Sequence, residues 1–380
     1  MSMTPTVSLR ACFAELTDPR REHCRLHGLW DILALTICAV VSGADSWVEV
    51  AKYGQRKLAW LQTFLELPHG IPAHDTFGRV FALLDPAALQ AGFRTWMEAL
   101  VEATAGRLIA VDGKTLRHSF DTAAGKGPLH LVSAWATANR LLLGQQAVDS
   151  KSNEITAIPE LLKILDLSGA IVTIDAMGCQ KAIAAQLDDA GADYVLALKE
   201  NQETLYEDVQ QLFVKGLEND FADSVHHAYR TTEENHGRVE TRTYHVVPVP
   251  KELAERHAAW QGLRSFGMVF RERQVGHEEA TCETGFFITS LAPKVKTFAR
   301  AVRGHWGIEN SLHWVLDISF REDDSRLRKD HGPENLALLR RLAVSLLHNA
   351  DSAKVGVACK RKQAGWDNDY LLEVLGASLT

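Results

Sequence analysis

Three acidic residues stand at positions from which their side chains could act together. Asp112 and Asp175 each end a short apolar run, at residues 108–111 and 170–174, and such runs are typical of buried strands. Glu309 lies in a stretch whose pattern predicts a helix. Carboxylate oxygens favour hard divalent cations, and two such cations support phosphoryl transfer by activating water and stabilising the leaving oxygen. The acids therefore predict a site for two Mg²⁺ or Mn²⁺ ions.

Six motifs follow one another in an order that is more specific than any one of them. They are Val111-Asp-Gly-Lys114, Lys151-Ser-Asn-Glu-Ile-Thr-Ala-Ile-Pro-Glu160, Thr173-Ile-Asp-Ala-Met-Gly-Cys-Gln180, Leu196-Ala-Leu-Lys-Glu-Asn-Gln202, His236-Gly-Arg-Val-Glu240 and His305-Trp-Gly-Ile-Glu-Asn-Ser-Leu-His-Trp314. In this order they resemble DDE-type transposases of bacterial insertion sequences, in the H-repeat-associated, or Rhs-element-associated, branch. The resemblance covers nearly the whole chain.

This resemblance implies a polynucleotidyl transferase that cleaves DNA at insertion-sequence ends and transfers the strand into target DNA. The catalytic and metal-binding residues would be Asp112, Asp175 and Glu309. The implied partners are the terminal inverted repeats and a target duplex. Because an element has two ends, a homodimer on DNA is expected.

The order of predicted elements agrees with a ribonuclease H-like core. The strand-like runs are residues 108–112, 129–136, 141–148, 170–175 and 194–198, with helices expected at 154–165 and 178–190. The resulting order, βββαβαβ, is that of ribonuclease H. It would place Asp112 on the first, central strand and Asp175 on the adjacent fourth strand.

The rest of the chain predicts an α/β protein with additions around that core. We expect helices at residues 26–41, 46–64, 76–84 and 334–350, and strands at 239–247, 264–275 and 283–289. The predicted parts are an N-terminal helical domain at 1–100, the first part of the core at 101–215, a β-rich insertion at 216–290, and the completion of the core with the catalytic helix at 291–380. The family resemblance implies that the N-terminal domain binds DNA.

The stretch around Glu309 departs from the wider insertion-sequence pattern. That pattern has an Arg four residues before the Glu and a Lys seven residues after it, where this chain has His305 and Leu316. His305 is therefore a catalytic candidate, as a neutral hydrogen-bond donor to the scissile phosphate or its attacking water. Arg303 is the first candidate for the missing basic contact.

The candidate DNA-binding cations are Lys114, Lys199, Arg238, Arg242 and Arg303. Arg238, Glu240 and Arg242 would share one face of a strand, because side chains alternate between the faces. Such a row could contact phosphate. The alternative interpretation is an exposed strand face whose charges pair with one another.

Composition limits the class of protein. The chain has 380 residues and a net charge of −7, which argues against indiscriminate coating of nucleic acid. No apolar run reaches the roughly 18 residues of a membrane span, and the six cysteines form no CxxC pair. We expect a cytoplasmic bacterial protein, associated with the nucleoid while it acts.

Two other functions remain open at this point. One is a metal-dependent nuclease that cuts DNA without joining the ends. The other is an inactive DNA-binding remnant of a mobile element. Terminal inverted repeats in the flanking DNA would distinguish a mobile transposase from both.

Overall fold

The computed structural model describes residues 8–100, 108–122, 125–148, 153–222, 224–235, 237–276, 278–350 and 352–376. The chain divides into two compact units. The first contains Met1–Thr104, Gly113–Lys151 and Glu309–Thr380, and the second contains Ala105–Asp112 and Ser152–Ile308. The division into four parts that the sequence suggests stays a prediction.

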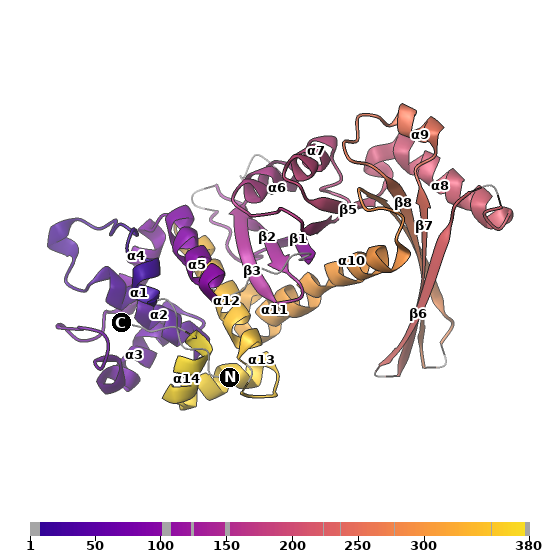
Figure 1. Ribbon diagram of the computed structural model, residues 1–380. Helices are drawn as coiled ribbons and strands as arrows, with labels where there is room; N and C mark the ends of the chain where they lie inside the picture. Colours follow the sequence, from indigo (N-terminus) through magenta and orange to yellow (C-terminus); the bar gives the residue numbers. More distant parts are fainter. Residues whose placement is uncertain are drawn as a thin grey trace. The chain divides into compact units, whose positions relative to one another are not determined.

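Helices make up most of the first unit (Figure 1). The three predicted N-terminal helices are confirmed as α2 (Leu29–Val41), α3 (Trp47–Leu61) and α4 (His74–Leu83). A capping box fixes the start of α3: the Ser46 hydroxyl accepts a hydrogen bond from the Glu49 amide, and the Glu49 carboxylate accepts one from the Ser46 amide. The other helices are α1 (Leu9–Cys12), α5 (Pro86–Leu100), α11 (Trp314–Phe320), α12 (Gly332–Asn349), α13 (Val357–Trp366) and α14 (Asn368–Leu375).

The apolar helix predicted at residues 334–350 is confirmed as α12, which forms the centre of this unit. It is buried over most of its length and packs against α2, α4 and α5. Asn335 donates hydrogen bonds to the carbonyls of Phe81 (2.7 Å) and Leu84 (2.9 Å), which satisfies acceptors left over at the end of α4. A fully buried ion pair, Arg341 with Glu322 (2.8 Å), ties α12 to the segment that precedes it.

Two strands of the first unit form an antiparallel hairpin, β2 (His130–Ala136) and β3 (Leu141–Ala147). The end of β1 (Leu108–Thr115) lies beside β2, and just beyond it the Leu116 amide donates to the Leu129 carbonyl (2.8 Å). The strand order in this unit is therefore β3-β2-β1.

One continuous sheet forms the second unit. The first part of β1 pairs in parallel with β4 (Ile171–Ile174), and β4 pairs in parallel with β5 (Asp193–Leu198). Beyond β5 the order is β9-β8-β7-β6, all antiparallel. These strands are β6 (His227–Asn235), β7 (Arg238–Pro248), β8 (Ser265–Val275) and β9 (Thr281–Thr289). The insertion is β-rich as predicted, and its strands extend the core sheet.

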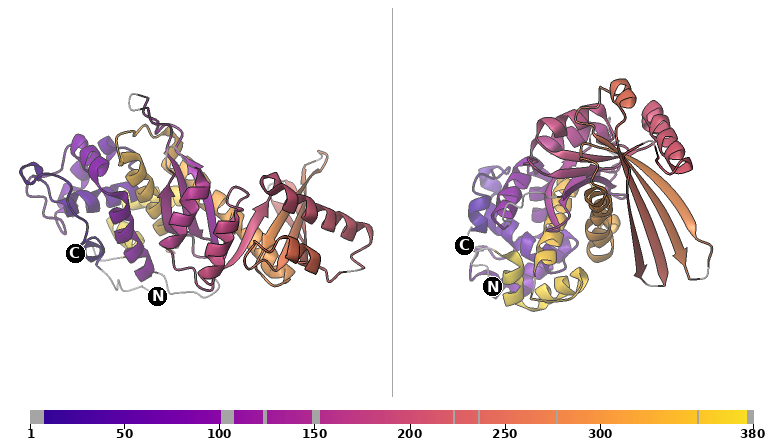
Figure 2. Two further views of the ribbon diagram at one scale, coloured as in Figure 1. Left: turned by 90° about the horizontal axis from the view of Figure 1, so that it is seen from above. Right: turned by 45° about the vertical axis from the view of Figure 1, so that its right-hand side comes forward.

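Helices cover both faces of this sheet (Figure 2). On one face lie α6 (Glu154–Lys163) and α7 (Lys181–Asp189), with Ile158 of α6 facing Ile174 of β4 around Gly178. On the other face α10 (Val295–Ile308) buries Phe298 and Val302 against residues of the sheet that include Leu108 and Ile171. The remaining helices are α8 (Glu203–Glu218) and α9 (Lys251–Arg256).

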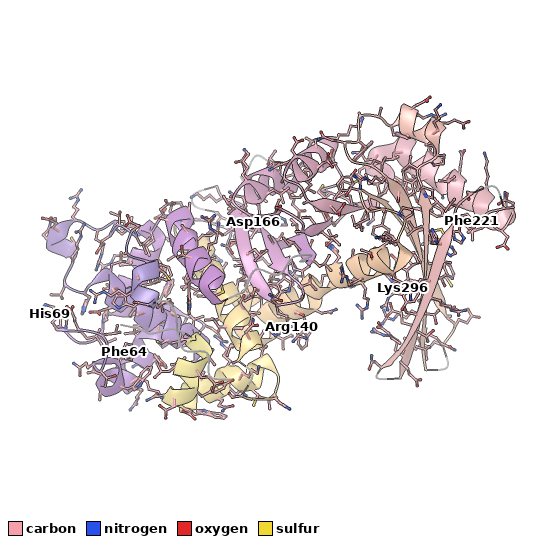
Figure 3. The ribbon with its side chains drawn as sticks, viewed as in Figure 1. Phe64, His69, Arg140, Asp166, Phe221 and Lys296 are labelled. Carbon is pink, nitrogen blue, oxygen red and sulfur yellow. The ribbon has the colours of Figure 1, made fainter. Side chains whose placement is uncertain are left out.

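The first turn of α10 lies against the far end of the sheet. The ammonium of Lys296 is 5.7 Å from the ring centre of Tyr229 on β6 (Figure 3). This helix therefore spans the sheet from β6 to β4 and presents its last turn to β4. No helix within the described ranges is long and apolar enough to cross a membrane.

Candidate active site

Asp112 and Asp175 occupy neighbouring positions on two parallel strands. Val111 of β1 pairs with Ile174 of β4, so the two aspartates are the next residues in the same register. Parallel neighbours lie about 4.8 Å apart across a sheet. Asp175 directly follows β4, as predicted, but the predicted end of β1 at Asp112 is wrong, because that strand continues to Thr115.

Strand pleating directs both carboxylates to the face of the sheet that α10 covers. Alternation places Asp112 on the same side of β1 as Leu108, and Asp175 on the same side of β4 as Ile171. Leu108 and Ile171 belong to the apolar cluster that packs against α10. Both acids are half-buried. The Asp112 and Asp175 carboxylates thus lie side by side on the sheet face that α10 covers.

The loop after β4 holds the Asp175 carboxylate. Its Oδ1 accepts hydrogen bonds from the amides of Met177 (3.1 Å) and Gly178 (3.3 Å). A side chain at Gly178 would place Cβ 2.3 Å from Ile174 and 2.9 Å from Ile158, so only glycine lets the loop pack this closely. The loop is therefore shaped around the carboxylate.

Two residues of the Leu196–Gln202 motif support this loop from the other side. Asn201 donates a hydrogen bond to the Ala176 carbonyl (2.7 Å), and Gln202 donates one to the Cys179 carbonyl (3.0 Å). Sequence reasoning noted the motif without assigning these side chains a role. The available signal was a pair of adjacent amide side chains that begins three residues after the end of a strand.

Burial raises the pKa of Asp175, and the negative charge of Glu154 raises it further. The two backbone amides and the exposed Lys199 oppose that rise. Lys199 therefore lies near this carboxylate, at the end of β5. An anion that its surroundings destabilise is suited to binding a cation.

His305 lies in the last turn of α10, above the same strand. Its Nδ1 is 3.0 Å from the hydroxyl of Thr173, which stands two residues before Asp175 on the same face of β4. The Thr173 hydroxyl is also 3.4 Å from the Ile109 carbonyl. Burial lowers the pKa of His305 to about 4, so the imidazole is neutral at pH 7.

Glu309 begins a π-helical turn, Glu309–His313, between α10 and α11. The helix that the sequence predicts over residues 305–316 is confirmed, with this π-helical turn inside it. Single π-helical turns inside α-helices occur frequently at functional sites. Glu309 is exposed. Over the described part of the chain, no group of three or more His, Cys, Asp or Glu side chains is close enough to hold a metal ion.

Comparison with known proteins decides the family. Residues 103–346 match the family model "Transposase DDE domain", and residues 10–97 match the model "DDE_Tnp_1-associated". The chain belongs to the DDE transposase family.

Several Escherichia coli proteins are similar to this chain, and one of them is named as H-repeat-associated. The chain is 40% identical to "Putative transposase YncI" of strain O157:H7 over 372 residues, 97% of this chain and 95% of that one. It is also 40% identical to "H repeat-associated putative transposase YhhI" of strain K12, over 93% of each chain. A short match of 55 residues, 47% identical, is to "Inactive transposase YbfQ" of strain K12, covering 14% of this chain and 66% of that one.

Two of the cations predicted to bind DNA in this transposase are ion-paired instead. Lys114 lies in the first unit with its side chain largely buried, and its ammonium is 2.8 Å from Asp317 and 3.4 Å from Asp323. Arg303, in the second unit, is 3.0 Å from Glu233. The Lys114 ammonium is largely buried with its partners, whereas Arg303 and Glu233 are 43% and 41% exposed and form a weak surface pair.

The row of charges on β7 is likewise neutralised. Arg242 is buried, bonds to Glu240 through its guanidinium and lies 3.2 Å from Glu233 on β6. DNA binding by Arg242 stays a prediction, and its burial and pairing favour the alternative of a paired strand face, although this pair is buried. Arg238 remains half-exposed, 3.8 Å from Glu240.

Proposed function

We propose that this family member is an active, metal-dependent DNA transposase that cleaves at insertion-sequence ends and joins the strand to target DNA. The observation that carries the proposal is the pair of carboxylates, Asp112 and Asp175, in register on one face of a parallel strand pair. In the family, such acids serve phosphoryl transfer. The strand order β3-β2-β1-β4-β5 supports a ribonuclease H-like core.

Asp112, Asp175 and Glu309 would hold two divalent cations, Mg²⁺ or Mn²⁺. The residues fit this role because all three supply only oxygen, the donor that these cations prefer. The raised pKa of Asp175 also fits, since a nearby cation would stabilise the carboxylate that burial and Glu154 destabilise. When bound, the cations would activate water or a 3′-hydroxyl and stabilise the leaving oxygen.

The protein's own groups would position the DNA. Thr173 holds Nδ1 of His305, which leaves Nε2 as the ring nitrogen for a phosphate oxygen or the attacking nucleophile. In a neutral imidazole only one of the two ring nitrogens carries hydrogen. The hydrogen bond between Nδ1 and Thr173 therefore decides whether Nε2 donates or accepts. Lys199, near Asp175, is the candidate cation for the scissile phosphate.

Double-stranded DNA is the proposed partner, with the two element ends held by a homodimer in the bacterial cytoplasm and at the nucleoid. A second candidate function is that of an inactive DNA-binding remnant, which the similarity to an inactive transposase favours. The third is a nuclease without joining activity.

One assay separates the three functions. The purified protein is incubated with linear DNA that carries the element's ends and flanking sequence, together with a supercoiled target. In Mg²⁺ or Mn²⁺ a transposase yields cleaved ends and joined products, a nuclease yields cleaved ends alone, and a remnant yields neither. Ca²⁺ should support mainly binding, and EDTA should abolish both reactions.

A further inference from the structure

A basic groove in the first unit lies outside the acidic site. It has a volume of about 510 Å³ and is lined by residues of α3, α4 and the segment that leads into α12. Four of its lining residues are cations, Arg79, Arg326, Arg328 and Lys329. Its one acid, Asp75, is 3.2 Å from the His74 imidazole, which also lines the groove.

The four cations differ from Lys114, Arg242 and Arg303 because none of them is ion-paired with a carboxylate of the described residues. Arg79 donates only to the Asp75 carbonyl (3.3 Å) and the Thr76 hydroxyl (3.4 Å). Arg328 donates to the His118 carbonyl (3.3 Å) and lies over the Phe120 ring. Arg326 and Lys329 are exposed. Their charge is thus available to a ligand.

Two helices begin at the groove and add to its positive potential. His74 is the first residue of α4, and Gly332 is the first residue of α12. Neither N-terminus has a side-chain cap. Within the described residues, the His74 and Asp75 amides of α4 remain for an external acceptor, whereas at α12 the Gly332 amide donates to the Lys329 carbonyl (2.9 Å) and Pro333 has no N–H. The helix dipole places partial positive charge at both ends.

We infer that this groove binds the phosphate backbone of double-stranded DNA, through Arg79, Arg326, Arg328, Lys329 and the N-terminus of α4. A wide groove with a succession of cations suits a polyanion better than a single small anion. The chain's net charge of −7 makes such a concentration of unpaired cations unusual for this surface. The inference rests on the proposed function for its choice of DNA, and it adds a second contact surface outside the acidic site.

The test compares two variants of the full chain that lose the same charge. Arg326→Ala/Lys329→Ala removes the two exposed cations of the groove. Lys163→Ala/Lys251→Ala removes two exposed lysines that pair with glutamates elsewhere. Binding to a short random-sequence duplex is measured by fluorescence anisotropy in Ca²⁺ over a range of salt concentrations, because phosphate contacts do not depend on sequence. Circular dichroism checks the fold of both variants.

Two lost phosphate contacts should lower the slope of log affinity against log salt by about 1.8 in the groove variant, and the control should keep the wild-type slope. A groove variant with the slope and affinity of the control would overturn the inference. A groove variant that loses affinity for a double-stranded RNA probe but not for the DNA duplex would also overturn it.

Cleavage by the wild type in Mg²⁺ separates this inference from the proposed function. If the wild type cleaves and the groove variant keeps the wild-type salt slope and affinity, the inference alone is overturned. A lowered slope in a protein that never cleaves supports the groove and overturns the proposed function.

Discussion

At the scale of single residues, the site depends on how its two aspartates are held. Asp175 is fixed by two backbone amides of its own loop, and that loop is held by Asn201 and Gln202. His305 is fixed by Thr173, two residues before Asp175. Asp175 and His305 therefore each have a named partner that restricts their orientation, which is what preorganised catalysis requires.

Replacing His305 tests its assignment as a catalytic donor. His305→Gln should keep part of the cleavage rate, because the amide can still donate a hydrogen bond, whereas His305→Ala should lose roughly 10² to 10³, the scale of one transition-state donor. Single-turnover cleavage of a pre-bound end measures this. Circular dichroism should show both variants folded. An Ala variant that folds and cleaves at the wild-type rate would reduce His305 to a packing residue.

Glu334 gives the protein a dependence on pH that a single substitution should remove. Burial, with the charge of Asp85 beside it, raises the pKa of Glu334 to about 7. Between the unfolded pKa of about 4.3 and 7, the folded protein holds this proton more tightly than the unfolded chain. Its contribution therefore makes the free energy of unfolding fall as pH rises through this window.

Glu334→Gln should consequently raise the melting temperature at pH 8 relative to the wild type, by more than it does at pH 5. The exposed Glu66→Gln in the same unit is the control and should show no such pH-dependent difference. An equal effect of Glu334→Gln at both pH values would contradict the raised pKa.

At the scale of elements, local sequence predicted the strands that carry the acids, because an apolar run that ends in Asp is a short-range pattern. It missed β6, whose sequence alternates exposed and half-buried residues with few apolar ones at the edge of the sheet. It also missed the π-helical turn at Glu309. Periodicity near 3.6 residues does not show where a helix shifts its hydrogen bonds by one residue.

The cations on β7 show the other limit of sequence reasoning. The two-residue alternation of Arg238, Glu240 and Arg242 is correct, but the partners that neutralise Arg242 include Glu233 on the neighbouring strand. Lys114 is likewise paired with Asp317, 203 residues away. Charge patterns in sequence do not reveal such pairings, because tertiary contacts create them.

Arg242→Ala should therefore destabilise the fold without changing the salt dependence of DNA binding. Removing one partner of a buried ion pair costs roughly 3 to 5 kcal/mol, because it leaves the other charge buried. Here Arg271, 3.6 Å from Glu240, would offset part of that loss. The double variant Glu240→Met/Arg242→Met should recover much of that loss, since an apolar pair leaves no buried charge between these positions. Thermal melts measure the first effect and anisotropy the second. An Arg242→Ala protein with the wild-type melting temperature and a lower salt slope would show instead that Arg242 contacts DNA.

At the scale of the whole molecule, acidic residues neutralise most of the cations that sequence would assign to DNA, and the groove beside α4 and α12 keeps its cations unpaired. The predicted N-terminal DNA-binding region thus gains a specific surface, although two of its contributors, Arg326 and Lys329, lie more than 240 residues further along the chain than Arg79. Family membership follows from the motifs because their order spans the chain. The groove does not follow from them, because only folding brings its two segments together.

The most direct test of the central claim is single-turnover cleavage of a pre-bound element end by amide variants of the three acids. Asp112→Asn, Asp175→Asn and Glu309→Gln keep the shape of each side chain and remove the negative charge that would hold a cation. We expect each to bind the end with nearly wild-type affinity and to show no cleavage in Mg²⁺ or Mn²⁺, while Asp166→Asn, an exposed aspartate away from the strand ends, cleaves normally. Wild-type cleavage by any one of the three variants would contradict the assignment of Asp112, Asp175 and Glu309.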